Sequence, residues 1–471
     1  MPETTCWRSV VLPVLTVGGL FVLGSCRLPV RAPESTRVSH PQRLAQGKSS
    51  PQGESELEPG PTLSADSTLD AYRLYAVANN PNLEGLYHQW RAQMERAPQV
   101  RALPEPRLSY AEFLVPVQTR AGPQERKFAL SQTLPWFGKL GLRGSIEEEA
   151  AKASWQRFSG AQLAVDHRMR STYAEYYYLG KSVSITRENL DLLRRIESVA
   201  RKKLAAGAEN HRDIIRLQVE MGRLEDRLNT LLDMRTPLRA KLNAILNRRG
   251  DTDIPWPAEL PEAALALDDS TLFRYLEENN PELLALQHEI ERQSLATKLA
   301  KKEYFPDIAV GVETIVTGSA LAPNIRDSGD GDDAWALTFS TELPIWFQKY
   351  GAGEREAKER RYAAKKKHEG KQNDLRAELD LALYHLRDSE RKVSLYRNTL
   401  IPKAQESLSA MEAAFRADAV DFLDLVDSQR VLLEFQLSRE RALSDRLRAE
   451  AGIDRLVGRF AILPPAKGEE D

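Results

Sequence analysis

The chain contains the same pattern twice. Asn79-Asn80-Pro81 and Asn279-Asn280-Pro281 each precede a helical pattern, 200 residues apart. The stretch Leu134-Pro135-Trp136-Phe137-Gly138-Lys139 has a counterpart in Leu343-Pro344-Ile345-Trp346-Phe347-Gln348-Lys349. Two further matches follow in the same order at an offset of 211 residues: 213–218 with 424–429, and 242–248 with 453–459. A unit of about 200 residues is too long for a solenoid repeat, so the sequence predicts a duplicated fold.

Each copy predicts the same order of elements. A helix runs from Thr68 to Val100, and its counterpart runs from Thr271 to Glu303. Two strands follow, and the loops after the first strand of each copy, 118–125 and 318–333, are polar. A very long helix starts after the Leu-Pro motif, and a turn leads into a final helix. The fold class is therefore mainly α with a small β part.

Apolar side chains alternate with small or polar ones in Asp307–Val316 and Ala334–Leu343, as they do in half-buried strands. Each segment is about ten residues long, which a tilted strand needs to cross a bilayer. In the first copy, Lys127–Leu134 alternates well and Arg107–Val117 poorly. A soluble antiparallel sheet has the same alternation, so the strands alone leave a membrane barrel and a soluble sheet open.

The helices carry a stronger signal. Nine of ten successive a/d positions between Ile214 and Ile245 are apolar, and Arg235 is the exception, which predicts a coiled-coil seam. The corresponding helix of the second copy has two apolar facets, which favours neighbours on both sides; the facets are Leu425, Leu432 and Phe435, and Leu423, Val426, Leu433 and Leu437.

The long helices are predicted to span a distance. The segment 138–206 has no internal proline and would reach roughly 100 Å as one helix. Its counterpart, 350–416, contains Pro402, which should break or kink it.

The N-terminus has the features of a signal peptide. A short apolar run, Val10–Leu23, follows Arg8. It closes with Leu23-Gly24-Ser25-Cys26, which resembles the bacterial lipobox and implies a covalent lipid on Cys26; an ordinary signal peptide with an incidental cysteine is the alternative. The predicted organisation is a signal peptide (1–25), a lipidated proline-rich tether (26–66), two repeats (67–260 and 261–460) and a polar tail (461–471).

Composition and motifs argue against other functions. The chain has 66 basic and 68 acidic residues, so it lacks the positive excess of a nucleic-acid binder. It contains no phosphate-binding, zinc-protease or serine-hydrolase motif. His88 and His288 are interpreted as packing or surface residues, and the acidic run 327–333 as a solvated turn rather than a calcium loop. We expect neither an enzyme nor a cofactor other than the lipid.

The ordered duplication, the lipobox and the stretches 132–140 and 420–430 resemble the TolC family of outer-membrane efflux proteins. The resemblance implies a homotrimer in the outer membrane, lipid-anchored, with a 12-stranded β-barrel on a long periplasmic α-helical barrel. It also implies a passive exit duct for drugs or metal cations. Its partners would be a periplasmic adaptor and an inner-membrane transporter, expected to be of the RND type.

The resemblance assigns roles to the helical tips. Adaptor docking is expected around Leu204, Gly207, Asp213 and Gln218 in the first copy, and around Phe415, Asp418 and Gln429 in the second. Asp418 stands where the family usually has glycine. Asp421 and Asp424 resemble the aspartates that narrow the tunnel entrance. They share a helix face, and tripled by symmetry they would favour cations. A solvated acidic helix start is the alternative.

Two other functions stay open. In the first, the protein is again a duct of the TolC family in the outer membrane, but it exports proteins by type I secretion. The other is a lipid-anchored periplasmic coiled-coil adaptor or scaffold, which predicts soluble strands that do not form a barrel.

Overall fold

The computed structural model describes residues 63–64, 67–205, 211–261, 268–319, 331–417, 419–420 and 422–460, without the side chains of residues 203, 213, 422 and 423. All of these belong to one compact unit, residues 51–471. The predicted signal peptide, the predicted lipidation site Cys26 and the predicted C-terminal tail lie outside the described residues.

The first predicted helix of each copy is in fact divided. In the first copy it forms α2 (Leu69–Asn79), α3 (Pro81–Met94) and α4 (Arg96–Arg101). The Asn80 side chain accepts hydrogen bonds from the backbone N–H groups of Asn82 and Leu83, and so caps a helix that Pro81 opens. In the second copy, Asn280 does the same between α7 (Asp269–Asn279) and α8 (Pro281–Lys302). The Asn-Asn-Pro landmark is therefore itself a helix boundary.

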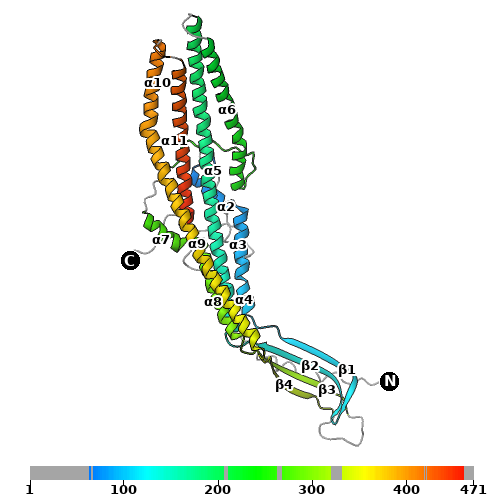
Figure 1. The fold of residues 1–471 in the computed structure, drawn as a ribbon. Coiled ribbons are helices and arrows are strands. Elements are labelled where there is room, and N and C mark those ends of the chain that lie inside the picture. Colours follow the sequence, from blue (N-terminus) through cyan, green and yellow to red (C-terminus); the bar gives the residue numbers. More distant parts are fainter. Residues whose placement is uncertain are drawn as a thin grey trace, which may run out of the picture. The chain divides into compact units, whose positions relative to one another are not determined.

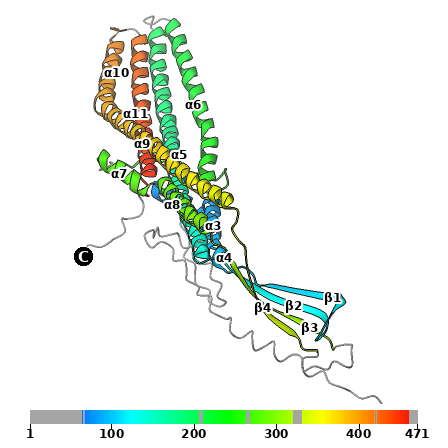
Figure 2. The ribbon, with the colours of Figure 1, turned by 60° about the horizontal axis from the view of Figure 1, so that its bottom comes forward.

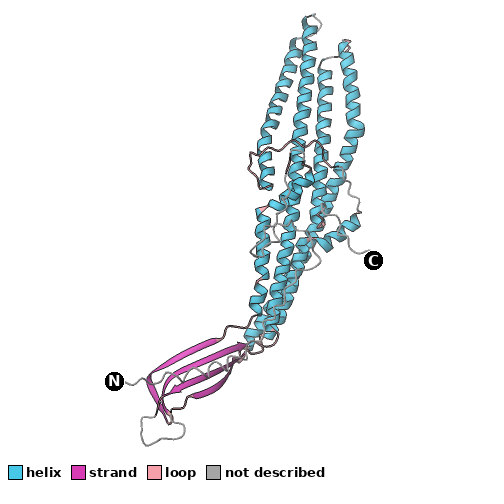
Figure 3. Cartoon of the chain, turned by 180° about the vertical axis from the view of Figure 1, so that it is seen from behind, coloured by secondary structure: helices cyan, strands magenta, loops and turns pink. Residues whose placement is uncertain are grey.

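The predicted strands are confirmed, and they form one antiparallel sheet, drawn in magenta in Figure 3. Their order in the sheet is β1-β2-β3-β4 (Figure 1). The strands are β1 (Arg107–Thr119), β2 (Gly122–Leu134), β3 (Ile308–Thr317) and β4 (Ala334–Thr341). The pairing of β2 with β3 joins the two copies. The predicted loop 118–125 was too long: only two residues separate β1 from β2, and Gly122, with a φ of 129°, permits the tight reversal.

The long helices follow the strands, as predicted. The first copy has α5 (Lys139–Ala205), which is unbroken, and α6 (His211–Ile245). The second copy has α9 (Phe347–Leu395), the π-helical turn η3 (Tyr396–Leu400), α10 (Ile401–Arg416) and α11 (Phe422–Leu456). Pro402 lacks an N–H and its ring conflicts with the carbonyl four residues earlier. The π-helical turn η3 is wider than an α-helical turn and ends just before Pro402. It accommodates both the missing N–H group and the bulk of the proline ring.

Helices α10, α11, α5 and α6 lie side by side in that order and share one apolar core (Figures 1 and 2). The predicted seam of α6 is confirmed, with Leu217 and Leu242 among its fully buried residues. Arg235 is tolerated in the seam because its Nε donates to the Tyr176 hydroxyl at 3.2 Å and its guanidinium lies over the Trp256 ring. Both facets of α11 have buried members, Leu425 and Leu432 on one and Val426, Leu433 and Leu437 on the other. Helix α11 contacts α5 on one side and α9 and α10 on the other.

Candidate functional site

The sheet presents an apolar face that the protomer leaves exposed. The register places Leu108 beside Leu130 and Leu130 beside Val312, and Val312 is opposite Leu337. Leu108 is 73% exposed, and Leu337 is 62% exposed. The same face carries Tyr110, Phe128, Val310, Trp335 and Phe339. Toward the β1–β2 turn, this face also carries the charged residues Glu112 and Arg126, which lie opposite each other.

The opposite face of the sheet is lined by small side chains. It carries Ser109, Ala111, Ala129, Ser131, Thr133, Ala309, Gly311, Ala336, Thr338 and Ser340. A Cβ on Gly311 would lie 2.7 Å from the Thr338 hydroxyl oxygen and 3.0 Å from the Leu130 carbonyl oxygen, so this position requires glycine. An ion pair between Lys127 and Glu313 lies on this face, with 2.8 Å between nitrogen and oxygen. The sheet is thus strongly two-sided.

Exposed aromatic and aliphatic side chains gather where the sheet meets the helices. They come from both Leu-Pro motifs: Phe137, Leu343, Ile345, Trp346 and Phe347, each at least 60% exposed. Trp136 stacks on Phe305, with ring centroids 5.2 Å apart. Aromatic side chains concentrate at the interface between membrane and water, so this junction has the composition of a membrane boundary.

A buried lysine ties the junction together. Lys139, the first residue of α5, is 2% exposed, and its Nζ donates to the Phe305 carbonyl and to Asp307 Oδ1, each at 2.8 Å. The Trp136 backbone N–H donates to the same carboxylate oxygen at 2.9 Å. Although burial opposes it, these donors hold the pKa of Asp307 below its usual value. Lys139 belongs to the Leu-Pro motif, but nothing in that motif predicted that the lysine would be buried between these acceptors.

The predicted docking residues of the first copy lie at the end of the α5–α6 hairpin. Gly207 lies outside the described residues, as does the side chain of Asp213. Leu204 is half-buried. Gln218 is exposed, and its Nε2 donates to Glu197 Oε1 at 3.0 Å across the two helices. Gln218, together with Arg201, holds the pKa of Glu197 below its usual value.

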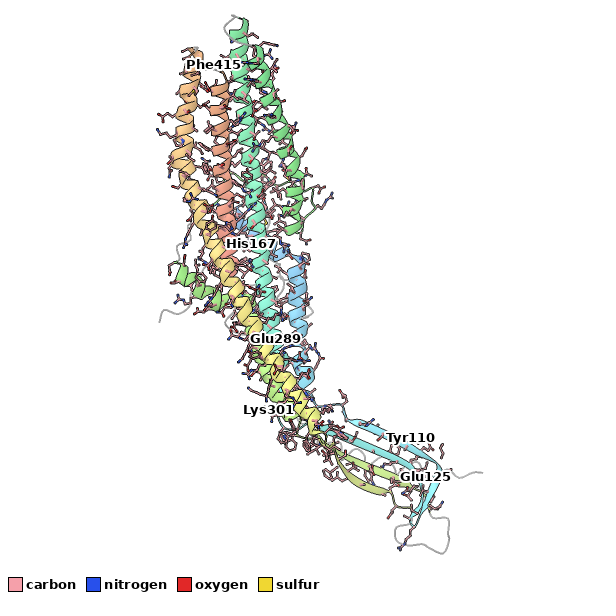
Figure 4. All side chains as sticks on the ribbon, viewed as in Figure 1. Tyr110, Glu125, His167, Glu289, Lys301 and Phe415 are labelled. Atoms are coloured by element: carbon pink, nitrogen blue, oxygen red, sulfur yellow. The ribbon has the colours of Figure 1, made fainter. Side chains whose placement is uncertain are left out.

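Two predicted docking residues of the second copy need correction. Phe415, near the tip in Figure 4, is 4% exposed and belongs to the core that the four helices share. Gln429 is equally buried, and its Nε2 donates to the Asn189 side chain on α5. Apolar burial and this interhelical hydrogen bond hold both side chains inside the protomer. They therefore support the tip from within and do not present a contact surface.

Asp424, one of the two predicted gate residues, lies on a groove between α10 and α11. The groove has a volume of about 320 Å³ and is lined by Ala404, Ser407, Met411, Asp424, Asp427, Ser428 and Val431. Asp424 is exposed. Asp421 and Asp418 lie outside the described residues, so their relation to this groove stays a prediction.

The two repeat-related histidines, His88 and His288, have different surroundings. His88 is exposed, and His288 Nδ1 lies 2.8 Å from a carboxylate oxygen of Glu149. Over the described ranges, no three histidine, cysteine or acidic side chains form a group that could hold a metal ion.

None of the helices in the described part of the chain combines the length and the apolar character needed to cross a bilayer.

This chain is similar in sequence and in fold to known proteins of outer-membrane efflux. A sequence model of the family described as outer membrane efflux protein matches residues 272–459. The cobalt-zinc-cadmium resistance protein CzcC of Cupriavidus metallidurans is 21% identical over 83% of this chain and 90% of that protein. The toxin and drug export protein A of Aggregatibacter actinomycetemcomitans is 23% identical over 41% of this chain and 42% of that protein. Among solved structures, CusC, described in terms of folding and transmembrane channel formation, superposes with a TM-score of 0.71. It has 16% identity and covers 83% of this chain and 92% of its own.

The fold is that of a TolC-type channel protomer, with a small antiparallel sheet on long helices. The match to the outer membrane efflux protein family covers residues 272–459, which lie in the second copy of the repeat.

Proposed function

We propose that three copies of this chain form a passive exit duct in the outer membrane. The main support for this proposal is that one face of the sheet is apolar and exposed. The outer strands of this sheet, β1 and β4, each have one edge without a partner in the described protomer. Unpaired strand edges are not tolerated in lipid, so such a sheet can enter a membrane only as part of a closed barrel. Four strands from each of three copies would close a 12-stranded barrel.

The helices would form the periplasmic tunnel. At 1.5 Å per residue, the 67 residues of α5 extend roughly 100 Å from the sheet to the tip hairpin. We infer that the tips meet a periplasmic adaptor and, through it, an inner-membrane transporter of the RND type. The lipid on Cys26 would add an anchor in the outer membrane. The similar protein CzcC is named for resistance to cobalt, zinc and cadmium. This similarity favours metal cations over drugs as the cargo.

The test combines assembly and conductance. Purified protein should migrate as a trimer in detergent, should shift to monomer on heating, and should produce discrete conductance steps in a planar bilayer. A stable monomer that never conducts would instead support the periplasmic adaptor or scaffold. The exposed apolar strands argue against that alternative, because a soluble scaffold gains nothing from them.

Type I protein secretion is the second candidate. It is favoured by the relative whose name states export of a toxin and of drugs. Deleting the gene separates the two candidates: sensitivity to divalent metals or drugs indicates efflux, and loss of one secreted polypeptide from the medium indicates secretion.

A further inference from the structure

The small-residue face of the sheet carries a cross-strand ion pair between the two copies of the repeat. Lys127 lies on β2 of the first copy and Glu313 on β3 of the second, and their charged atoms are 2.8 Å apart. Both belong to this face: Lys127 lies opposite Ala111, and Glu313 lies opposite Ala129 and Ala336. Among the described, register-paired residues of this face, the other charged side chain is Arg107 at the start of β1.

Strand geometry determines where this face points in the duct proposed above. Successive side chains of a strand alternate between the two faces of a sheet. If the face of Leu130 and Trp335 contacts lipid, the face of Lys127 and Glu313 lines the water-filled lumen. Apart from Ile315, which lies opposite Lys127, the side chains around the pair are small and would leave the lumen wide. Lys127 and Glu313 are 36% and 23% exposed, so water and passing ions reach them.

We propose that Lys127 and Glu313 set the ion selectivity of the barrel section by cancelling each other's charge. This inference rests on the proposed function. Three copies would place three neutral pairs around the lumen, a lining that passes cations and anions alike. Removing one partner leaves a ring of three like charges, which selects for the opposite sign.

The competing explanation is that the pair only joins β2 to β3. A cross-strand pair of opposite charges contributes about 0.2–1 kcal/mol to a sheet. Losing either partner removes the same bond, so this explanation predicts equal effects for Lys127→Gln and Glu313→Gln. A lumen role predicts opposite effects, because the two variants leave opposite charges behind.

Reversal potentials under a KCl gradient distinguish the two explanations. Glu313→Gln should lower the permeability ratio of cations to anions, and Lys127→Gln should raise it, each about twofold at 10 mM salt and less at 1 M, where the Debye length is about 3 Å. The double variant should regain the wild-type ratio. Shifts of the same sign, or no shift in channels that still conduct, would overturn the inference.

Labelling separates this inference from the proposed function. In mature protein reconstituted in liposomes, with the chain lacking either substitution as the background control, Ala129→Cys should react with a small, charged thiol reagent and Leu130→Cys should not. The opposite pattern overturns the assignment of the faces even in trimers that do not conduct. If Ala129→Cys reacts and Leu130→Cys does not, but the trimers do not conduct, the assignment of the lumen face stands and the result counts against an open duct. Reaction at both positions overturns the membrane barrel and the inference with it.

Discussion

Lys139 Nζ lies 2.8 Å from Asp307 Oδ1, and this ion pair joins the two copies of the repeat where the sheet meets the helices. The lysine is almost fully buried, and its ammonium is also 3.3 Å from a carboxylate oxygen of Glu303. The corresponding lysine of the second copy, Lys349, is exposed and lies over the Tyr350 ring. One repeat motif thus supplies a structural lysine in the first copy and a surface lysine in the second.

Lys139→Met should therefore destabilise the protein by about 1–3 kcal/mol, because the Phe305 carbonyl loses the donor Lys139 and the Asp307 carboxylate keeps the Trp136 N–H but loses its ion-pair partner. Thermal unfolding of the detergent-purified protein measures the effect. Lys349→Met is the matched control and should change the midpoint little. Equal effects of the two variants would contradict the structural role of Lys139.

Gly180→Ala should also be destabilising, although alanine is about 1 kcal/mol better than glycine within a helix. A Cβ at Gly180 would lie 2.7 Å from Cε3 of Trp256, and the indole is held between Tyr176 and Arg235. The rigid ring has to move, so the connection after α6 should loosen.

Limited proteolysis and the thermal midpoint report this change. Gly370→Ala on α9 is the control, because a Cβ there meets nothing within 4 Å. Because alanine has a higher helix propensity than glycine, Gly370→Ala should be neutral or slightly stabilising in the same assay. A Gly180→Ala protein as stable as Gly370→Ala would show that Trp256 does not constrain α5.

Glu450 makes the helical core sensitive to pH. Its side chain is 6% exposed, and burial raises its pKa to about 7 against the opposing charges of Arg446 and Arg170. The carboxylates of Asp454 and Glu390 raise the pKa further. Because the pKa in the folded state is above that in the unfolded state, this contribution to stability is full below about pH 4.5 and is lost as pH rises through about 7.

Glu450→Gln should remove this dependence and stabilise the protein at pH 8 by up to about 3 kcal/mol, with little effect at pH 4.5. Unfolding midpoints at pH 4.5, 6 and 8 test this. Glu434→Gln, an exposed position on the same helix, should keep the wild-type profile. An unchanged profile in Glu450→Gln would assign the pH dependence to other groups.

Asp424→Asn tests the predicted gate. If Asp424 helps to narrow the tunnel entrance, removing its charge should lower the cation preference of single channels. Asp427→Asn changes a neighbouring carboxylate of the same groove and should have a smaller effect. Equal effects of the two variants would indicate a diffuse acidic surface at the tip and would count against a gate residue.

Periodicity predicted those elements whose pattern depends on local geometry. The seam of α6, strands β2 to β4 and the unbroken α5 follow from heptad spacing, alternation and the absence of proline, whereas β1 forms although Arg107–Val117 alternates poorly. The division at Asn80 was missed because the residues on both sides continue a helical pattern, although the cap and Pro81 were visible in the sequence. The burial of Phe415 could not be predicted from the sequence, since an apolar residue at a helix end can belong to a core or to a docking surface.

The duplication, the helical and strand elements and the family resemblance can be recognised in the amino-acid sequence, because each depends on the order and spacing of residues along the chain. Three other features follow only from the folded arrangement: Lys139 is buried while Lys349 is exposed, Gln429 bonds to Asn189, and Lys127 pairs with Glu313. These relations join residues far apart in the chain. Their burial and charge are set by the packing and the strand register, which periodicity in one segment does not contain.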